Sequence, residues 1–166
     1  MSYRCVTCGE VHDDLPDLGA DRPDIWWSIP AEGREQKIQL TSDTCIVDQE
    51  NFFIRGVLQI PIHDYPRSFG FGVWVSQKRE NFIKYLENFD SDQIGPFFGW
   101  LSTRLSYYPT DTTNLKAMVH FRGKNVRPLI EVEPSNHPLA LDQRNGITLG
   151  KAWEIVHHTM RIIESN

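Results

Sequence analysis

The clearest periodicity in the chain lies near its C-terminus. From Thr148 to Glu164, apolar residues recur at three- and four-residue spacing, as they do along one face of an α-helix. Thr148 is a suitable N-cap residue, and no proline interrupts the stretch. His157 borders the apolar stripe and His158 lies toward its polar side, so packing is the simplest role for both. The pattern predicts a long amphipathic helix.

The middle of the chain alternates as β-strands do. Asn51–Ile62 is rich in aromatic and β-branched residues and has no polar face, which predicts a central strand. Phe69–Ser76 places four large apolar residues on one face, and two glycines on the other face leave room for a close neighbour. Leu115–Phe121 and Arg127–Glu133 predict the two strands of a hairpin, joined by a basic, solvated turn.

A shorter helix is predicted over Gln77–Phe89, with Ser76 as its N-cap, because apolar residues again recur at helical spacing. Phe97–Leu101 is too short to choose between a strand and a helical turn. Together these elements predict the α+β class, with an antiparallel sheet packed by the C-terminal amphipathic helix and the shorter helix.

The first part of the chain has no regular alternation of apolar and polar residues. Within residues 1–45, the stretch Val11–Glu35 holds three prolines and five aspartates and reads as irregular chain. Trp26 and Trp27 are adjacent, and on an extended segment they would point to opposite faces. We therefore expect one to pack on the core and the other to cover the edge of the domain or to meet a partner. We expect a single domain over residues 1–166, with the irregular segment at 1–45 and the α+β core at 46–166.

Charge and composition narrow the function classes. The 166 residues carry a formal charge of −5, with 40% hydrophobic and 23% charged residues, as in an ordinary globular protein. Residues 1–50 hold 11 acidic and 4 basic side chains, whereas the basic residues of the remainder are scattered. This distribution argues against nucleic-acid binding. It also predicts that a protein partner, if there is one, is basic.

Neither a membrane-spanning run nor a secretion signal is recognisable. The sequence has no stretch of about 18 apolar residues, and its N-terminus lacks the apolar core of a signal peptide. We therefore expect a cytoplasmic protein without membrane contact.

The strongest chemical motif is formed by two cysteines at the N-terminus. Cys5 and Cys8 form a C-x-x-C followed by glycine, the shape of a zinc knuckle, and His12 follows within reach of the same ion. Cys45 is the predicted fourth ligand, with His63 as an alternative. The sequence thus predicts a structural zinc site. Reduced thiols that pack as small apolar groups, or a redox pair, remain the competing interpretations.

No catalytic signature is present. The chain lacks a G-x-S-x-G elbow, a phosphate-binding loop, an H-E-x-x-H motif and a dinucleotide fingerprint. His63 adjoins Asp64 at a predicted strand end, and His137 lies in an Asn/Pro turn, where functional residues are common. An enzyme would have to gather Cys45, His63 and His137 around a metal or as a dyad.

A series of motifs also resembles a known family. The motifs are, in order along the chain, Cys5-x-x-Cys8-Gly9-x-x-His12, Pro23-Asp24-x-Trp26-Trp27, Ser42-Asp43-x-Cys45, Phe52-Phe53-Ile54-Arg55-Gly56, Gly72-Val73-Trp74-Val75-Ser76, Phe98-Gly99-Trp100-Leu101 and His137-Pro138-Leu139-Ala140. This order is similar to the bacterial domain of unknown function 2199, from Arg4 to about Glu164. The resemblance implies a bacterial protein and brings no known activity, and it favours metal binding by Cys5, Cys8, His12 and Cys45.

Two hypotheses therefore follow. The leading one is a non-enzymatic interaction protein with a structural zinc site, in which Trp26, Trp27 and His137 are the candidate binding residues. The alternative is a metal- or cysteine-dependent enzyme that uses Cys45, His63 and His137.

Overall fold

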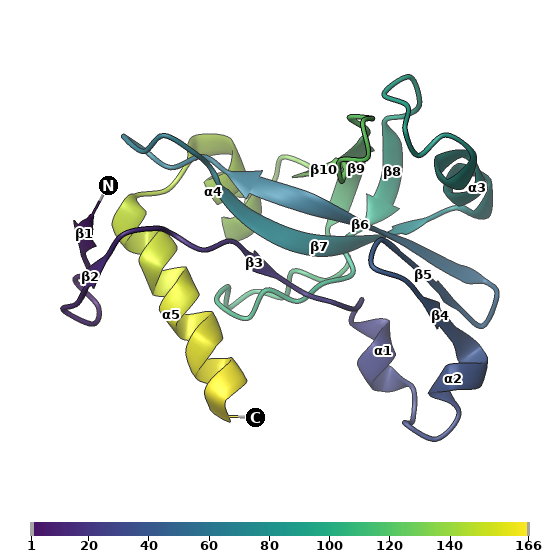
Figure 1. Ribbon diagram of the computed structural model, residues 1–166, viewed down its shortest axis with the longest axis horizontal. Coiled ribbons are helices and arrows are strands. Elements are labelled where there is room, and N and C mark those ends of the chain that lie inside the picture. Colours follow the sequence, from purple (N-terminus) through teal and green to yellow (C-terminus); the bar gives the residue numbers. More distant parts are fainter. Residues whose placement is uncertain (1, 166) are drawn as a thin grey trace.

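The computed structural model describes residues 2–165, which form an α+β fold (Figure 1). The strands are β1 (Tyr3–Arg4), β2 (Val11–His12), β3 (Leu18–Gly19), β4 (Ile38–Leu40), β5 (Thr44–Val47), β6 (Asn51–Ile60), β7 (Phe69–Gln77), β8 (Phe97–Trp100), β9 (Lys116–His120) and β10 (Leu129–Val132). The helices are α1 (Ile25–Ser28), α2 (Arg34–Lys37), α3 (Arg79–Glu87), α4 (Pro138–Asn145) and α5 (Leu149–Ser165).

The main sheet has the order β3-β7-β6-β10-β9-β8, and β5 pairs with both β4 and β6. The predicted hairpin is confirmed, because β9 and β10 pair antiparallel, and β6 is central as expected. The prediction of a purely antiparallel sheet is wrong: β10 runs parallel to β6, and β3 runs parallel to β7. Alternation along a strand reveals which face is buried but not which neighbour it pairs with, so the sequence pattern carried no sign of these two pairings.

The sheet curls until β8 returns to β7. Leu101 forms a bridge with Val75, and Ser102 N donates to Trp74 O at 2.7 Å. Gly99 makes this approach possible, because a Cβ at that position would overlap the carbonyl oxygen of Ser76. The hydrophobic core takes its sheet residues from β6, β7, β9 and β10, and Leu101, directly after β8, joins them.

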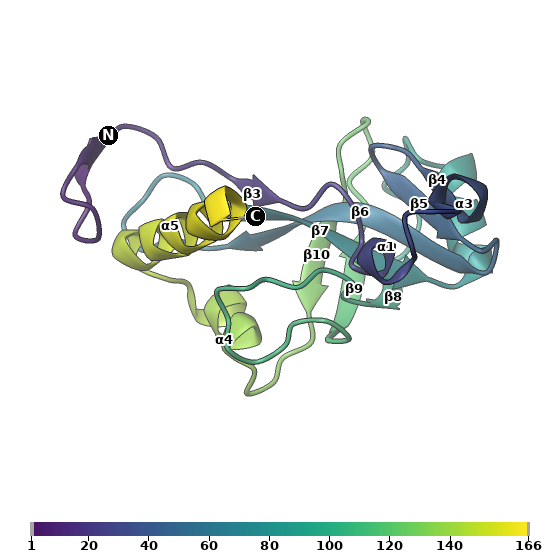
Figure 2. The ribbon, with the colours of Figure 1, turned by 90° about the horizontal axis from the view of Figure 1, so that it is seen from below.

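The long helix α5 packs against this core (Figure 2). Its N-terminal half buries four residues: Ala152, Trp153, Ile155 and Val156. As predicted, the Thr148 hydroxyl accepts a hydrogen bond from the backbone N–H of Lys151 at 3.1 Å. The apolar stripe extends beyond the core, however, since Met160 and Ile163 are exposed.

Three local predictions need correction. The shorter helix begins at Arg79 with Lys78 as its N-cap, because Ser76 stays in β7, where its hydroxyl accepts from Trp100 N at 3.0 Å. The Trp26–Trp27 segment is not extended but forms the helical turn α1. The turn that contains His137 continues into α4. In these short stretches tertiary contacts and capping decide the conformation, and sequence periodicity is too brief to show it.

Within the described residues, none of the helices has the length and apolar character required to cross a membrane.

Candidate metal centre

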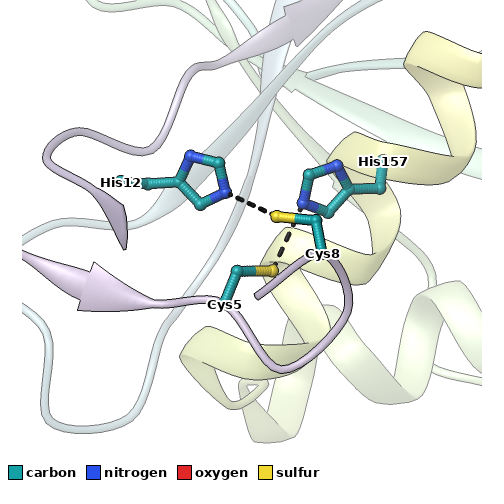
Figure 3. Close-up of side chains that lie close together, drawn as sticks. All are labelled: Cys5, Cys8, His12 and His157. Carbon is teal, nitrogen blue, oxygen red and sulfur yellow. Dashed lines mark hydrogen bonds between the residues drawn. The ribbon is translucent and has the colours of Figure 1, made fainter. Parts of the chain in front are cut away.

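The N-terminal segment folds into a small hairpin that brings three candidate ligands together. β1 and β2 pair antiparallel, and the Cys5 N–H donates to Glu10 O at 2.8 Å. Gly9 turns the chain with φ of 78°, a conformation that favours glycine, and its N–H donates to Cys5 O. Cys5, Cys8 and His12 thereby face one another across the turn (Figure 3).

The fourth member of the group comes from the other end of the chain. His157 projects from α5 toward the hairpin, and its Nε2 lies 3.3 Å from Cys5 Sγ (Figure 3). On the opposite side of the group, His12 Nε2 lies 3.2 Å from Cys8 Sγ. One ligand atom from each of the four residues lies within 4.8 Å of every other.

These distances suit a metal ion of the size and geometry of zinc. Around a tetrahedral zinc, bonds of about 2.3 Å to sulfur and 2.0–2.1 Å to nitrogen place the donor atoms about 3.3–3.8 Å apart. The four donors need only small movements to reach that arrangement. Two thiolates and two imidazoles form one of the usual sets of structural zinc ligands.

Neighbouring groups fix the ring of His12 and change the pKa of Cys5. The ring of His12 stacks on Trp153, with centroids 4.0 Å apart and an interplanar angle of 17°. Burial by itself would raise the pKa of the Cys5 thiol, but hydrogen bonds from Cys8 and Thr7 outweigh it and lower the pKa, which favours the thiolate that metals bind. Cys5 is buried and Cys8 is exposed.

Cys45, the predicted fourth ligand, is not part of this group. It lies in β5, between β4 and β6, and packs in a separate hydrophobic cluster with Phe53 and Trp74. Figure 1 shows β5 at the opposite end of the sheet from β1 and β2. Burial raises the pKa of Cys45 to about 11, so it is a protonated, packed thiol at neutral pH.

The two loop histidines are also engaged elsewhere. His63 Nε2 lies 2.9 Å from Asn145 O, so it is not the alternative fourth ligand. His137 caps α4: its Nδ1 accepts from Leu139 N at 3.0 Å, and its Nε2 lies 3.0 Å from Asp111 O. In residues 2–165, Cys45, His63 and His137 form no group that could hold a metal.

The two tryptophans of α1 have arginines of this chain as neighbours. Trp27 is exposed, and Trp26 is half-buried. Arg22 Cζ lies 4.4 Å from the centre of a Trp26 ring, and Arg34 Cζ lies 5.3 Å from it. The candidate binding residues of this segment therefore present positive as well as aromatic surface.

Comparison with known proteins gives one match. Residues 4–147 match the model of a family described as uncharacterized protein conserved in bacteria (DUF2199). The chain belongs to this family. Searches of curated proteins and of solved structures both find no match for this DUF2199 protein. The matched residues include Cys5, Cys8 and His12 and end before α5, so His157 lies outside them. The match is thus shorter than the resemblance, which extends to about Glu164.

His157 is the ligand candidate that sequence analysis missed. It is separated from Cys5 by 152 positions, and only the packing of α5 brings the two together. One signal was present in the sequence, namely the spacing of one helical turn between Trp153 and His157. The structure shows that Trp153 stacks on His12. Without the fold, that spacing was indistinguishable from ordinary packing along an apolar stripe.

Proposed function

We propose that this DUF2199 protein is a non-enzymatic binding protein whose N-terminal hairpin is held on α5 by a structural zinc ion. The observation that supports the zinc site is the convergence of Cys5, Cys8, His12 and His157 within 4.8 Å of one another. Soft thiolates together with imidazoles favour zinc over the hard cations Mg²⁺ and Ca²⁺.

The number of donors favours a structural role. Four protein ligands complete the tetrahedral coordination of zinc, whereas catalytic sites keep one position open for water or substrate. The ion would join the first residues of the chain to the last helix, and the β1–β2 hairpin by itself is too short to be stable. Bound there, the metal supplies cross-linking rather than Lewis-acid chemistry.

The three residues named for an enzyme have other roles in the structure. Cys45 is buried with a raised pKa, His63 is hydrogen-bonded to the backbone of the last residue of α4, and His137 is hydrogen-bonded to the backbone at the N-terminus of that helix. A nucleophile and its base must come within hydrogen-bond reach, and these three residues give no such contact in the described chain. A binding role is therefore the better supported function.

Metal content tests the zinc site directly. Untagged protein, purified without chelator or added metal, is expected to contain one zinc per chain by elemental mass spectrometry. A Cys5→Ser, Cys8→Ser variant should contain none, whereas Cys45→Ser, the matched control at the remaining cysteine, should keep the full content. Cobalt reconstitution should give the thiolate charge-transfer absorption of a tetrahedral site.

The proposal is wrong if reconstituted protein holds no zinc, or if Cys45→Ser loses as much metal as the double variant.

A further inference from the structure

Two large aromatic side chains of β8 project from the sheet toward solvent. Phe98 and Trp100 are 41% and 43% exposed, and their rings meet edge to face with centroids 5.2 Å apart. Gly99 between them faces β7, where no larger residue fits, so both neighbours must face outward. Adjacent exposed aromatic residues are typical of interaction sites.

Trp100 lines two hollows in the surface. One, of about 570 Å³, is lined by Phe98, Trp100, Met118 and the carboxylates of Glu131 and Glu133, among others. The second, of about 450 Å³, shares Trp100 with the first and includes Asp24 and Asp111 in its lining. We call the six residues that matter here the Trp100 surface: Asp24, Phe98, Trp100, Asp111, Glu131 and Glu133.

The charge of this surface is negative. Its four carboxylates face two cationic side chains in the same hollows, Arg104 and Lys116. Glu131 has only a long contact to His120, at 3.7 Å, and the described residues provide no ion pair for Glu133. Burial raises the pKa of Asp24 and the nearby charge of Asp111 raises it further, while the backbone N–H and the charge of Arg104 offset part of this rise.

Trp100 differs from three of the other tryptophans in its cationic neighbours. Trp26, Trp27 and Trp74 each have an arginine Cζ within about 6 Å of a ring centre. No such contact involves Trp100 in residues 2–165. A lysine or arginine of another molecule could therefore stack on this ring between the two acidic hollows.

We propose that the Trp100 surface binds an extended segment of a partner protein through lysine or arginine side chains. One basic side chain enters each hollow, and the segment crosses the ring of Trp100 between them. This inference rests on the proposed function as a binding protein, and it names the class of partner and the surface that recognises it. The surface is built from β8–β10 and neighbouring loops, not from the metal ligands.

Selection from a random peptide library tests the proposal without assuming a partner. Zinc-reconstituted protein is immobilised, and displayed 12-residue peptides are selected after depletion on the Trp100→Ala variant. The recovered peptides are expected to be enriched in lysine and arginine. Acidic or uncharged peptides, or no recovery above the depleted background, would overturn the proposal.

Binding of the best recovered peptide then locates the surface. By fluorescence anisotropy, Trp100→Ala should weaken binding about 30-fold, as expected for a central aromatic contact. Glu131→Gln with Glu133→Gln should weaken it about 10-fold or more at low salt and little at high salt. The matched controls Phe89→Ala and Glu87→Gln, an exposed aromatic residue and an exposed acid elsewhere, should leave affinity unchanged. Equal losses in the controls contradict the assignment.

Two further measurements separate the possible failures. Analytical ultracentrifugation tests whether a second copy of the chain occupies the surface: a dimer that Trp100→Ala dissociates would overturn the basic partner. Metal content is measured on the same samples. Protein that binds basic peptides but never takes up zinc refutes the metal site alone, and protein that holds zinc but selects no basic peptide refutes the Trp100 surface alone.

Discussion

Replacement of His157 by alanine gives the most direct test of how zinc stabilises this fold. Cys5, Cys8 and His12 lie within eight residues of one another, so an unfolded chain can still offer these three donors to a metal. Only the folded chain adds His157 from α5. The stabilisation by zinc therefore depends on the fourth ligand, because a ligand stabilises a protein only by its preference for the folded state.

The expected size follows from the length of the chain. Zinc at 100 times its dissociation constant stabilises a state that alone binds it by about 2.7 kcal/mol. Unfolding a chain of 166 residues has an entropy of about 350 cal/mol/K, at roughly 2.1 cal/mol/K per residue. Zinc held at that concentration should therefore raise Tm by at most about 8 °C. Binding to the unfolded chain reduces this, so we expect roughly 4–8 °C for the natural protein and under about 2 °C for His157→Ala.

Scanning calorimetry measures both values, with each protein studied in buffered zinc and in excess chelator. The difference between the two conditions removes any effect of the substitution on the metal-free fold. His158→Ala is the matched control, because His158 is the next residue of α5 and lies outside the four-residue group. If His157→Ala keeps the full gain in Tm, or if His158→Ala loses as much, the fourth ligand is wrongly assigned.

Three further predictions concern the rest of the fold. Burial raises the pKa of Cys45 from 9.0 to about 11, so between pH 9 and 11 the folded state holds a proton that the unfolded state has lost. The free energy of unfolding, measured with urea, should therefore fall over this range, and it should fall less steeply in Cys45→Ala. Equal slopes in the two proteins would contradict this prediction. Gly99→Ala should destabilise by about 3 kcal/mol because its Cβ overlaps a β7 carbonyl, whereas Gly19→Ala, with its nearest contact at 3.4 Å, should cost under about 1 kcal/mol in the same assay. Tyr108→Phe removes a 2.9 Å hydrogen bond to a carboxylate of α4 and should lower stability by about 1–2 kcal/mol; an unchanged urea midpoint would show that the bond contributes nothing.

Much of the local structure could be predicted because its signals are local. The helix over 148–164, the alternation of Phe69–Ser76 and the hairpin of β9 and β10 all follow from the period at which apolar residues recur. Elements of one turn, such as α1, and the entry into α4 were missed, because so few residues contain no measurable period.

The candidate site divides in the same way. Three of its donors, Cys5, Cys8 and His12, are close in the sequence, and glycine at position 9 allows the turn that brings them together. The spacing of the fourth donor along the chain carries no information, since His157 meets Cys5 only after α5 has packed on the sheet. Cys45 was the reasonable choice by residue type, but β5 buries it in a different cluster.

The sequence by itself therefore determined the α+β class, the family, the principal strands and helices and a three-donor knuckle at the N-terminus. The tertiary structure alone decided the parallel pairings of β3 and β10, the place of His157 and the exposure of Phe98 and Trp100 around one acidic surface. The physical reason is that periodicity and turn chemistry act between near neighbours, whereas strand partners, a shared metal centre and a surface depend on which distant segments pack together.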